Sequence, residues 1–323
     1  MLVKYCAANW RADMKNELEI ELPTTANDIR KGSGAPVILI HGLAASLHDW
    51  DDLIPELTKN GYAAYALDLL GHGDSPKPKT RAYRIQWLSE HFFAWMESLH
   101  LTEPAILVGH SLGGYIALEF ARRFPERTRG LILVNPFYRR SQLPYLLRAT
   151  YASSNLRDFI IGHTPEWMFR MIVDATSVAM GNSNGSRHAL PERVRLQTAI
   201  DYTRTAPGIY YIPNDIADAT DALPQIVAPT LVVWGDRDQT LAPTSFPPLV
   251  DALPHAAGRT IKAGHVPHQS NAEEFNRVVL EFLKQIEDPS LLHRGSEAER
   301  TLRRRFRRPA DLPVGEFNLP PYI

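Results

Sequence analysis

"GHSLGG", residues 109–114, sets a serine between two glycines, directly after the apolar letters ILV. A helical pattern follows over residues 112–125 and is stopped by a proline. A nucleophilic serine on a strand-to-helix turn needs small neighbours, which Gly109 and Gly113 provide. The start of the helix also offers backbone N–H groups to an anion. This context predicts that Ser111 is a nucleophile.

A second stretch, "GNSNG" at residues 181–185, fits the same G-x-S-x-G pattern around Ser183. Its glycines belong to a polar run, "GNSNGSRH", and no apolar strand leads into it. Clusters of Gly, Ser and Asn between periodic segments are typical of loops. Ser183 is therefore expected in a surface loop, and Ser111 is the candidate nucleophile.

The length and composition indicate a large globular protein. The chain has 323 residues, and a single hydrophobic core usually stops growing at roughly 250–300 residues. We therefore expect one large domain with an insertion or a tail. Hydrophobic residues make up 44% and charged residues 22%, with a net charge of −1. This balance is close to the average of soluble proteins and excludes a strong overall attraction to nucleic acid.

Cysteine content and hydropathy further limit the kind of protein that the sequence can encode. Cys6 is the only cysteine, which excludes an internal disulfide and a cysteine-based metal site. No H-E-x-x-H motif is present either, so no metal site is predicted. The beginning of the sequence has no apolar stretch of signal-peptide length, and no run reaches the about 20 apolar residues of a membrane span. A cytoplasmic protein is the expectation.

Short apolar strands alternate with amphipathic helical segments along the chain. Continuously apolar strands separated by helices favour a parallel sheet that is covered on both faces. The expected strands are residues 37–42, 62–75 (running into a loop), 104–111, 130–136, 229–238 and 258–265, and the expected helices are residues 50–61, 85–99, 112–125 and 273–287.

One long segment, residues 137–221, contains no convincing strand although strands of the core type flank it. The segment is rich in aromatic residues and methionine. We expect a mostly helical insertion that caps the carboxyl edge of the sheet, with most aromatic side chains in a core and some lining a pocket. The domain prediction is a core of residues 1–136 and 222–288, a cap of residues 137–221 and a tail of residues 289–323.

A serine hydroxyl needs a base to take its proton and a carboxylate to orient that base. Two later segments supply these groups, and both follow strands at the edge where active sites of open α/β sheets gather. "WGDRD" carries Asp236 and Asp238, and "KAGHVPH" carries His265 and His268. The order serine, acid, histidine is the one expected for a nucleophile turn of this type.

With these residues in place, the sequence resembles the α/β-hydrolase superfamily. The motifs that carry the resemblance are "HGLAAS", "DLLGHGDS", "GHSLGG", "GDRD" followed by Pro243, and "GHVPH" before "EEFN". They occur in the family's order from Val37 to Phe275. The resemblance implies an α/β-hydrolase fold, in which a mostly parallel central sheet has helices on both faces and an inserted helical cap.

The resemblance also assigns the acid and the base. Asp238 matches the family's acid, three residues after the glycine of "GDRD", and His265 matches its base, directly after a glycine. Asp236 is then a turn residue, and His268 packs or hydrogen-bonds nearby. The resemblance therefore implies a catalytic triad of Ser111, Asp238 and His265 that needs no cofactor.

"HGLAAS" matches the family's oxyanion loop. This match implies that the backbone N–H of Leu43 stabilises a developing negative charge, together with the backbone N–H of Leu112. The apolar side chains of both leucines favour an apolar acyl chain. His41 resembles the histidine that braces this loop, His72 is expected to fix another loop, and His110 need not point the same way as the nucleophile.

The predicted function is that of a serine hydrolase, carboxylesterase- or lipase-like, that cleaves a small-molecule apolar acyl ester through an acyl-enzyme. A C–C bond hydrolase, a lactonase and a perhydrolase are alternatives within the same fold. A ligand-binding receptor with slow turnover is an alternative of another class. A serine at position 111 argues against dehalogenases and epoxide hydrolases, whose nucleophile is a carboxylate. The oligomeric state is left open.

The tail of the sequence contains a helical pattern rich in arginine. "SEAERTLRRRFRRPADLP", residues 296–313, begins with a capping box, and Ala298, Leu302 and Phe306 recur at helical spacing. One short basic helix is therefore expected. Its many arginines favour a helix docked on the body with a solvated basic face, and weak contact with an anionic membrane surface is the alternative.

Overall fold

The computed structural model describes residues 22–80, 82–145, 148, 165–179 and 189–287. The chain divides into two compact units, Met1–Phe282 and Leu283–Ile323. The second unit is described only over residues 283–287, which end helix α12 (Ala272–Glu287). The predicted loop around Ser183 and the predicted basic helix in the tail lie outside the described residues.

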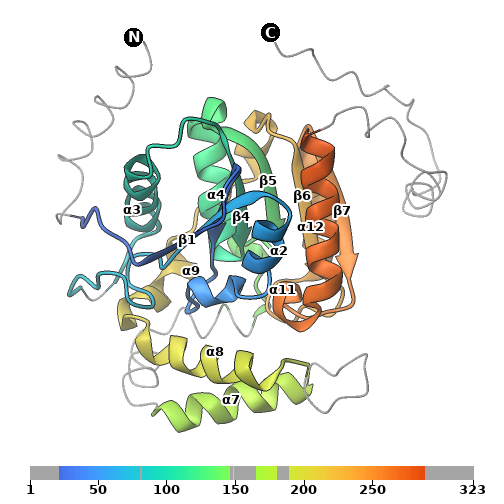
Figure 1. Cartoon of the computed structure of the whole chain (residues 1–323). Coiled ribbons are helices and arrows are strands. Elements are labelled where there is room, and N and C mark those ends of the chain that lie inside the picture. The colour runs from blue at the N-terminus through green and yellow to red at the C-terminus, as the bar shows by residue number, and fades with distance from the viewer. Residues whose placement is uncertain (1–21, 81, 146–147, 149–164, 180–188, 288–323) are drawn as a thin grey trace. The chain divides into compact units, whose positions relative to one another are not determined.

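Within the described residues, seven strands form one sheet in the order β1-β3-β2-β4-β5-β6-β7 (Figure 1). β1 runs antiparallel to β3, and all other neighbours pair in parallel. The central strands are buried, which explains their continuous apolar runs, since both of their faces are covered. The strands are β1 (Asp28–Lys31), β2 (Ala35–Ile40), β3 (Tyr62–Leu67), β4 (Ala105–His110), β5 (Thr128–Val134), β6 (Thr230–Gly235) and β7 (Ala256–Ile261).

Helices lie on both faces of the sheet (Figure 1). On one face, alternate side chains of β2, β4 and β5 form a single apolar cluster with α3 (Ile85–Ser98), α4 (Leu112–Arg123) and α10 (Phe246–Ala252). α2 (Ile54–Lys59) lies on the other side, and the short α11 (Pro267–Ser270) precedes α12. Among the described helices, none is long and apolar enough to cross a membrane.

The predicted strands and helices are confirmed, with shifts at their ends. The last predicted strand, 258–265, is β7 and lies a few residues earlier. The helix predicted over residues 50–61 is divided, because a 3-10 turn, Leu47–Trp50, precedes α2. Pro55 lies in the first turn of α2, where a proline fits because no intrahelical N–H bond is lost. β1 was not predicted, since its residues "DIRK" are mostly polar and lie at the sheet edge.

β5 and β6 are neighbours in the sheet although residues 137–221 separate them in sequence. The described residues of this inserted segment form helices and turns and no strand. α7 and α8 lie side by side at the carboxyl end of the sheet (Figure 1), with the rings of Phe169 and Tyr202 stacked. The elements are α7 (Glu166–Ala179), α8 (Glu192–Arg204), α9 (Ile212–Asp215) and the 3-10 turns Arg140–Gln142, Pro207–Tyr211 and Thr220–Gln225.

Candidate active site

Ser111 lies on the turn between β4 and α4, with a φ angle of +50°. A non-glycine residue in this left-handed region is strained, as expected of a nucleophile on a tight turn. A Cβ atom on Gly113 would lie 2.2 Å from the carbonyl oxygen of Ile40, and one on Gly109 would lie 2.4 Å from that of Gly113. Both positions therefore require glycine, because the backbone of α4 packs directly on the strands beneath it.

Asp238 follows β6 and His265 follows β7, so two further strands bring their side chains to Ser111. His265 Nδ1 lies 2.8 Å from Asp238 Oδ2, and His265 Nε2 lies 3.2 Å from Ser111 Oγ. A carboxylate only accepts hydrogen bonds, so Nδ1 carries the proton of the neutral ring. The lone pair of Nε2 then faces the serine hydroxyl, which is the tautomer that a general base needs.

Asp238 is buried and receives hydrogen bonds from several donors besides His265. These are the side-chain amide of Asn135 at 2.6 Å and the backbone N–H groups of Thr240 at 2.7 Å and Leu241 at 3.0 Å. Burial would raise the pKa of the carboxyl, but His265 and the hydrogen bonds from Leu241 and Asn135 lower it below its ordinary value. The group therefore stays ionised near neutral pH. Sequence reasoning missed Asn135, whose signal is its position directly after β5, the strand beside β6.

Asp236 and His268, the neighbours of the assigned acid and base, have other contacts. Asp236 accepts a hydrogen bond from the backbone N–H of Ala263 at 3.2 Å, as a turn residue would. His268 is buried, and its ring lies 4.9 Å from that of Trp50. The residues that the structure brings together with Ser111 are Asp238 and His265.

The peptide unit between Gly42 and Leu43, near Ser111, is held in place by a hydrogen bond to its carbonyl group. His41 Nε2 accepts a hydrogen bond from the backbone N–H of Leu69 at 2.9 Å, so the Nδ1–H of the ring donates to the carbonyl of Gly42 at 2.7 Å. In a trans peptide the N–H points away from the carbonyl of the same unit. The N–H of Leu43 is thereby turned away from His41.

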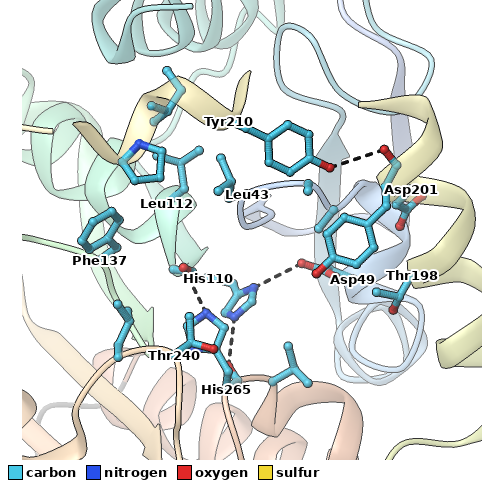
Figure 2. Close-up of a pocket in the computed structure, with 18 of the residues that line it drawn as sticks. Leu43, Asp49, His110, Leu112, Phe137, Thr198, Asp201, Tyr210, Thr240 and His265 are labelled. Carbon is cyan, nitrogen blue, oxygen red and sulfur yellow. Dashed lines mark hydrogen bonds and ion pairs between the residues drawn. The ribbon is translucent and has the colours of Figure 1, made fainter. Parts of the chain in front are cut away.

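The peptide unit after the serine is fixed in the same way. The carbonyl of Ser111 accepts hydrogen bonds from the backbone N–H groups of Gly114 and Phe137, each at 3.0 Å. This contact turns the N–H of Leu112 to the opposite side. Leu43 and Leu112 both line the pocket in front of the serine (Figure 2).

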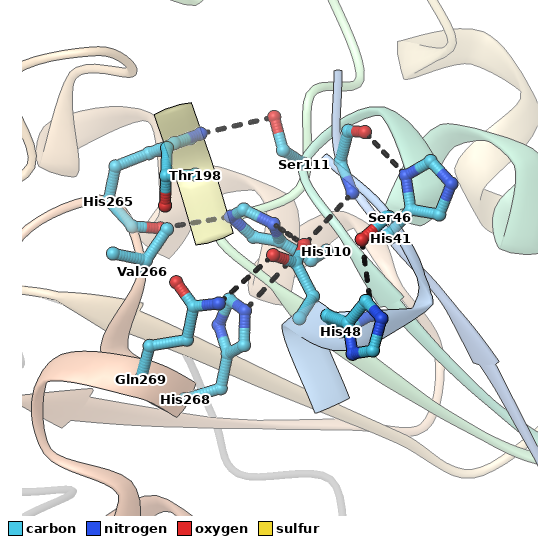
Figure 3. A network of polar contacts seen from close by, with 12 residues as sticks. His41, Ser46, His48, His110, Ser111, Thr198, His265, Val266, His268 and Gln269 are labelled. Carbon is cyan, nitrogen blue, oxygen red and sulfur yellow. Dashed lines mark hydrogen bonds and ion pairs between the residues drawn. The ribbon is translucent and has the colours of Figure 1, made fainter. Parts of the chain in front are cut away.

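A second polar network, which the sequence did not predict, lies beside His265 (Figure 3). His110 Nε2 lies 3.0 Å from the backbone carbonyl of His265, and His110 Nδ1 lies 3.3 Å from Asp49 Oδ2. Burial and the neighbouring His268 lower the pKa of His110 to about 4. Burial would raise the pKa of Asp49, but the contact with His110 and the nearby ring of His268, whose Nε2 lies 3.8 Å from Asp49 Oδ2, hold it well below its ordinary value. The network holds the loop that carries His265.

Asp49, His110 and His268 also place metal-ligating atoms within 4.8 Å of one another. The prediction of no metal site rested on missing zinc motifs, which do not detect residues from three separate segments. Gln269 completes the group, since its Nε2 donates to Asp49 Oδ1 at 3.1 Å. We interpret the group as a positioning network, and the absence of a metal stays a prediction.

A pocket of about 200 Å³ opens in front of Ser111 and His265. In Figure 2, Phe137 and Leu112 lie on one side of His265, and Asp49, Thr198 and Asp201 lie on the other. The described residues that line the pocket include no lysine or arginine. The inserted segment contributes Thr198, Asp201, Tyr202, Tyr210, Ile212 and Pro213 to the lining.

The fold and the site together define a class of protein, an α/β enzyme whose site lies at the carboxyl edge of a mostly parallel sheet. The chain belongs to the alpha/beta hydrolase fold family, whose model matches residues 35–272.

Curated relatives include esterases and lipases. A pimeloyl-[acyl-carrier protein] methyl ester esterase from Aeromonas hydrophila is 28% identical over 264 residues, which cover 79% of this chain and 97% of that protein. Lipase 3 from Moraxella sp. (strain TA144) is 24% identical over 274 residues, which cover 78% of this chain and 81% of that protein. The predictions of an α/β-hydrolase fold and of a hydrolase that acts on ester bonds are therefore confirmed.

Solved structures with the same fold include a thermophilic esterase from Thermogutta terrifontis, with a TM-score of 0.67 and 22% identity over 81% of this chain and 93% of that one. A meta-cleavage product hydrolase from Pseudomonas fluorescens IP01 has a TM-score of 0.64 and 25% identity, covering 80% of this chain and 94% of that one.

Proposed function

We propose that this protein is a serine hydrolase that cleaves a small-molecule ester with an apolar acyl group through an acyl-enzyme intermediate. The observation that carries the proposal is the continuous relay from Asp238 through His265 to Ser111, with contacts of 2.8 Å and 3.2 Å. The proton positions in this relay are those that activate a hydroxyl group.

The reaction follows from these contacts. Ser111 Oγ attacks the acyl carbon of the ester while His265 Nε2 takes the hydroxyl proton, and the ionised Asp238 stabilises the resulting imidazolium. The imidazolium then gives its proton to the leaving alcohol as the C–O bond breaks. A water molecule, deprotonated by His265, attacks the acyl-enzyme, and the serine leaves with that proton as the acid is released. No cofactor takes part in these steps.

The negative charge on the ester oxygen needs donors that are already in place. The N–H groups of Leu43 and Leu112 are our candidates, since the carbonyl of each peptide unit is held on the far side. Removal of one such donor typically costs about 2.7–4 kcal/mol of barrier. His41 and the Phe137 N–H would therefore act as positioning groups for the two donors.

Residues 137–221 act in this proposal as a cap over the active site, with a core of residues 1–136 and 222–288. The contribution of α8 and the following turns to the pocket lining supports this division. Weak membrane contact through the arginine-rich tail, residues 289–323, and a location in the cytoplasm remain predictions from the sequence.

A C–C bond hydrolase is the second candidate, favoured by the similarity to the meta-cleavage product hydrolase. The two activities differ in the bond that is cleaved. Pure enzyme offered an aryl butyrate and a vinylogous diketone in parallel would distinguish them.

Labelling with a fluorophosphonate probe tests the proposed nucleophile. We expect one covalent adduct on the peptide that contains Ser111, and none in Ser111→Ala. An adduct on Ser183 alone would contradict the assignment. Turnover of an ester at a steady rate after the first equivalent would also exclude a receptor that hydrolyses its ligand once and keeps the product.

A further inference from the structure

The polar end of the pocket carries a carboxyl group that the proposed mechanism does not use. Asp201 comes from α8, lines the pocket, and is only 4% exposed. Figure 2 shows it across the pocket from Phe137, on the same side as Thr198 and Asp49. A buried carboxyl group that faces a pocket needs either a partner in the protein or one in the ligand.

The partners of Asp201 within the protein are neutral. Ser46 Oγ donates to Asp201 Oδ2 at 3.0 Å, and Gln197 Nε2 donates to Asp201 Oδ1 at 2.8 Å. In the described part of the chain no ion pair reaches this carboxyl group. The arginines of α8 that form ion pairs contact other acids, in the pairs Arg193–Asp52, Arg195–Asp174 and Arg204–Asp74.

The other carboxyl group of the pocket, Asp49, has histidine contacts that Asp201 lacks. Asp49 receives hydrogen bonds from Gln269 and contacts His110 and His268. Since the described lining holds no lysine or arginine, a bound molecule would meet the charge of Asp201 with no cationic side chain of the protein beside it.

Burial raises the pKa of Asp201 to about 7, and the nearby carboxylate of Asp49 adds to this effect. Hydrogen bonds from Gln197 and Ser46, and the neighbouring His48, act in the opposite direction. The side chain is therefore mostly ionised at pH 8 and mostly neutral at pH 5.5.

We infer that Asp201 forms a charge-selective subsite for the alcohol part of the ester, which accepts a cationic group and repels a carboxylate. The inference rests on the proposed function, and it places the apolar acyl group at the opposite end of the pocket, beside the apolar side chains of Leu112 and Phe137. The substrate class is then an apolar acyl ester of an alcohol that carries a positive charge.

Three butyrate esters of similar size test the subsite: butyrylcholine, its uncharged analogue 3,3-dimethylbutyl butyrate, and the butyrate ester of 3-hydroxypropanoate. At pH 8 we expect kcat/KM to fall in this order. In Asp201→Asn the ratio of butyrylcholine to the neutral ester should fall by about tenfold, as one partly screened charge contact predicts, while the anionic ester gains. Ratios within one enzyme cancel any common effect on the triad.

The pH dependence of wild-type enzyme gives a second readout that needs no variant. Between pH 8 and pH 5.5 the ratio of butyrylcholine to the neutral ester should fall, because Asp201 becomes protonated. The same ratio should be independent of pH in Asp201→Asn. Any effect of pH on the proposed triad changes the rates of all three esters together and leaves the ratio unchanged.

Two control variants separate charge from structure. Asp221→Asn removes one negative charge from an exposed position of the same inserted segment, outside the pocket lining, and should keep the wild-type ratio. Ser46→Ala removes the contact between the oxyanion loop and α8 but leaves the carboxyl group, and should keep the order of the three esters.

An equal loss for all three esters in Asp201→Asn, or an unchanged ratio, would overturn the subsite while the esterase stands. Failure to cleave even the neutral ester, with Ser111 unlabelled by the fluorophosphonate, would overturn the proposed function and the subsite with it.

Discussion

Three of the histidines near Ser111 differ in the partners of their two ring nitrogens. His265 faces a carboxylate and a hydroxyl group, whereas His110 faces a carboxylate and a backbone carbonyl. His41 contacts backbone groups on both sides. A histidine takes up a proton during catalysis only where its free lone pair faces the reacting group. The geometry therefore supports one base and two positioning residues.

Substitutions of the proposed acid and base, and of the acid and histidine next to them in sequence, test which residues are catalytic. We expect His265→Ala and Asp238→Asn to lose roughly 10⁴-fold in kcat, the size of loss seen when a protease triad loses its acid. His268→Ala and Asp236→Asn, with no contact to the serine, should retain much more activity. Steady-state kinetics on one aryl ester, with circular dichroism to check folding, is the measurement. Equal losses at His265 and His268 would contradict the assignment.

At the scale of the elements, the close contact of α4 with β2 sets the position of the nucleophile. Gly113→Ala would push a methyl group to within 2.2 Å of the Ile40 carbonyl oxygen. We expect a loss of about 1–3 kcal/mol in the free energy of unfolding, as for other overpacked sites, and a loss of activity as the turn shifts. Gly114→Ala meets chiefly the side chain of Pro136, at 2.8 Å, and should cost less in both. Urea denaturation of the two variants measures whether Gly113→Ala loses more free energy of unfolding than Gly114→Ala.

The position of Asp201 on α8 also makes stability depend on pH. Its pKa of about 7 in the folded protein lies above the about 3.9 of an unfolded chain, so the folded state binds more protons between these values. The contribution of Asp201 to the free energy of unfolding therefore falls as pH rises, by at most about 1.4 kcal/mol per pH unit, and levels off above pH 7. Asp201→Asn should gain stability relative to wild type between pH 5 and pH 8. Urea denaturation at both pH values measures the difference, and a constant difference would contradict the shift.

The elements of the core were predictable because each carries a local signal. Apolar runs mark the buried parallel strands, and glycines around a serine mark the turn. β1 has no such signal, since its polar residues meet β3 only at the sheet edge. Asn135 and Asp49 were missed for a different reason. Each contacts its partner across a long separation in sequence, which only the assembled sheet brings together.

At the scale of the whole molecule, the sheet order explains why residues far apart in sequence form one site. β4, β5, β6 and β7 are consecutive neighbours, and their carboxyl ends present Ser111, Asn135, Asp238 and His265 in turn. The inserted segment leaves the sheet after β5 and returns before β6, so its helices reach the same edge. The order of the triad along the chain could be predicted from sequence. That the pocket has an apolar end and a polar end could not be predicted from sequence, because this depends on which face of α8 meets the carboxyl edge of the sheet.

The size of the pocket predicts which acyl groups the enzyme prefers. Its volume of about 200 Å³ lies below the roughly 300–1,000 Å³ of pockets for drug-sized ligands, which favours short chains. Each methylene that becomes buried beside Leu112 and Phe137 contributes up to about 0.8 kcal/mol. We therefore expect kcat/KM for aryl esters to rise from acetyl to about butyryl or hexanoyl and then to fall as the pocket fills. Rates with pure enzyme at one pH measure the series. A preference for acetyl would indicate a smaller substrate, and cleavage of a vinylogous diketone without any ester turnover would indicate a C–C bond hydrolase.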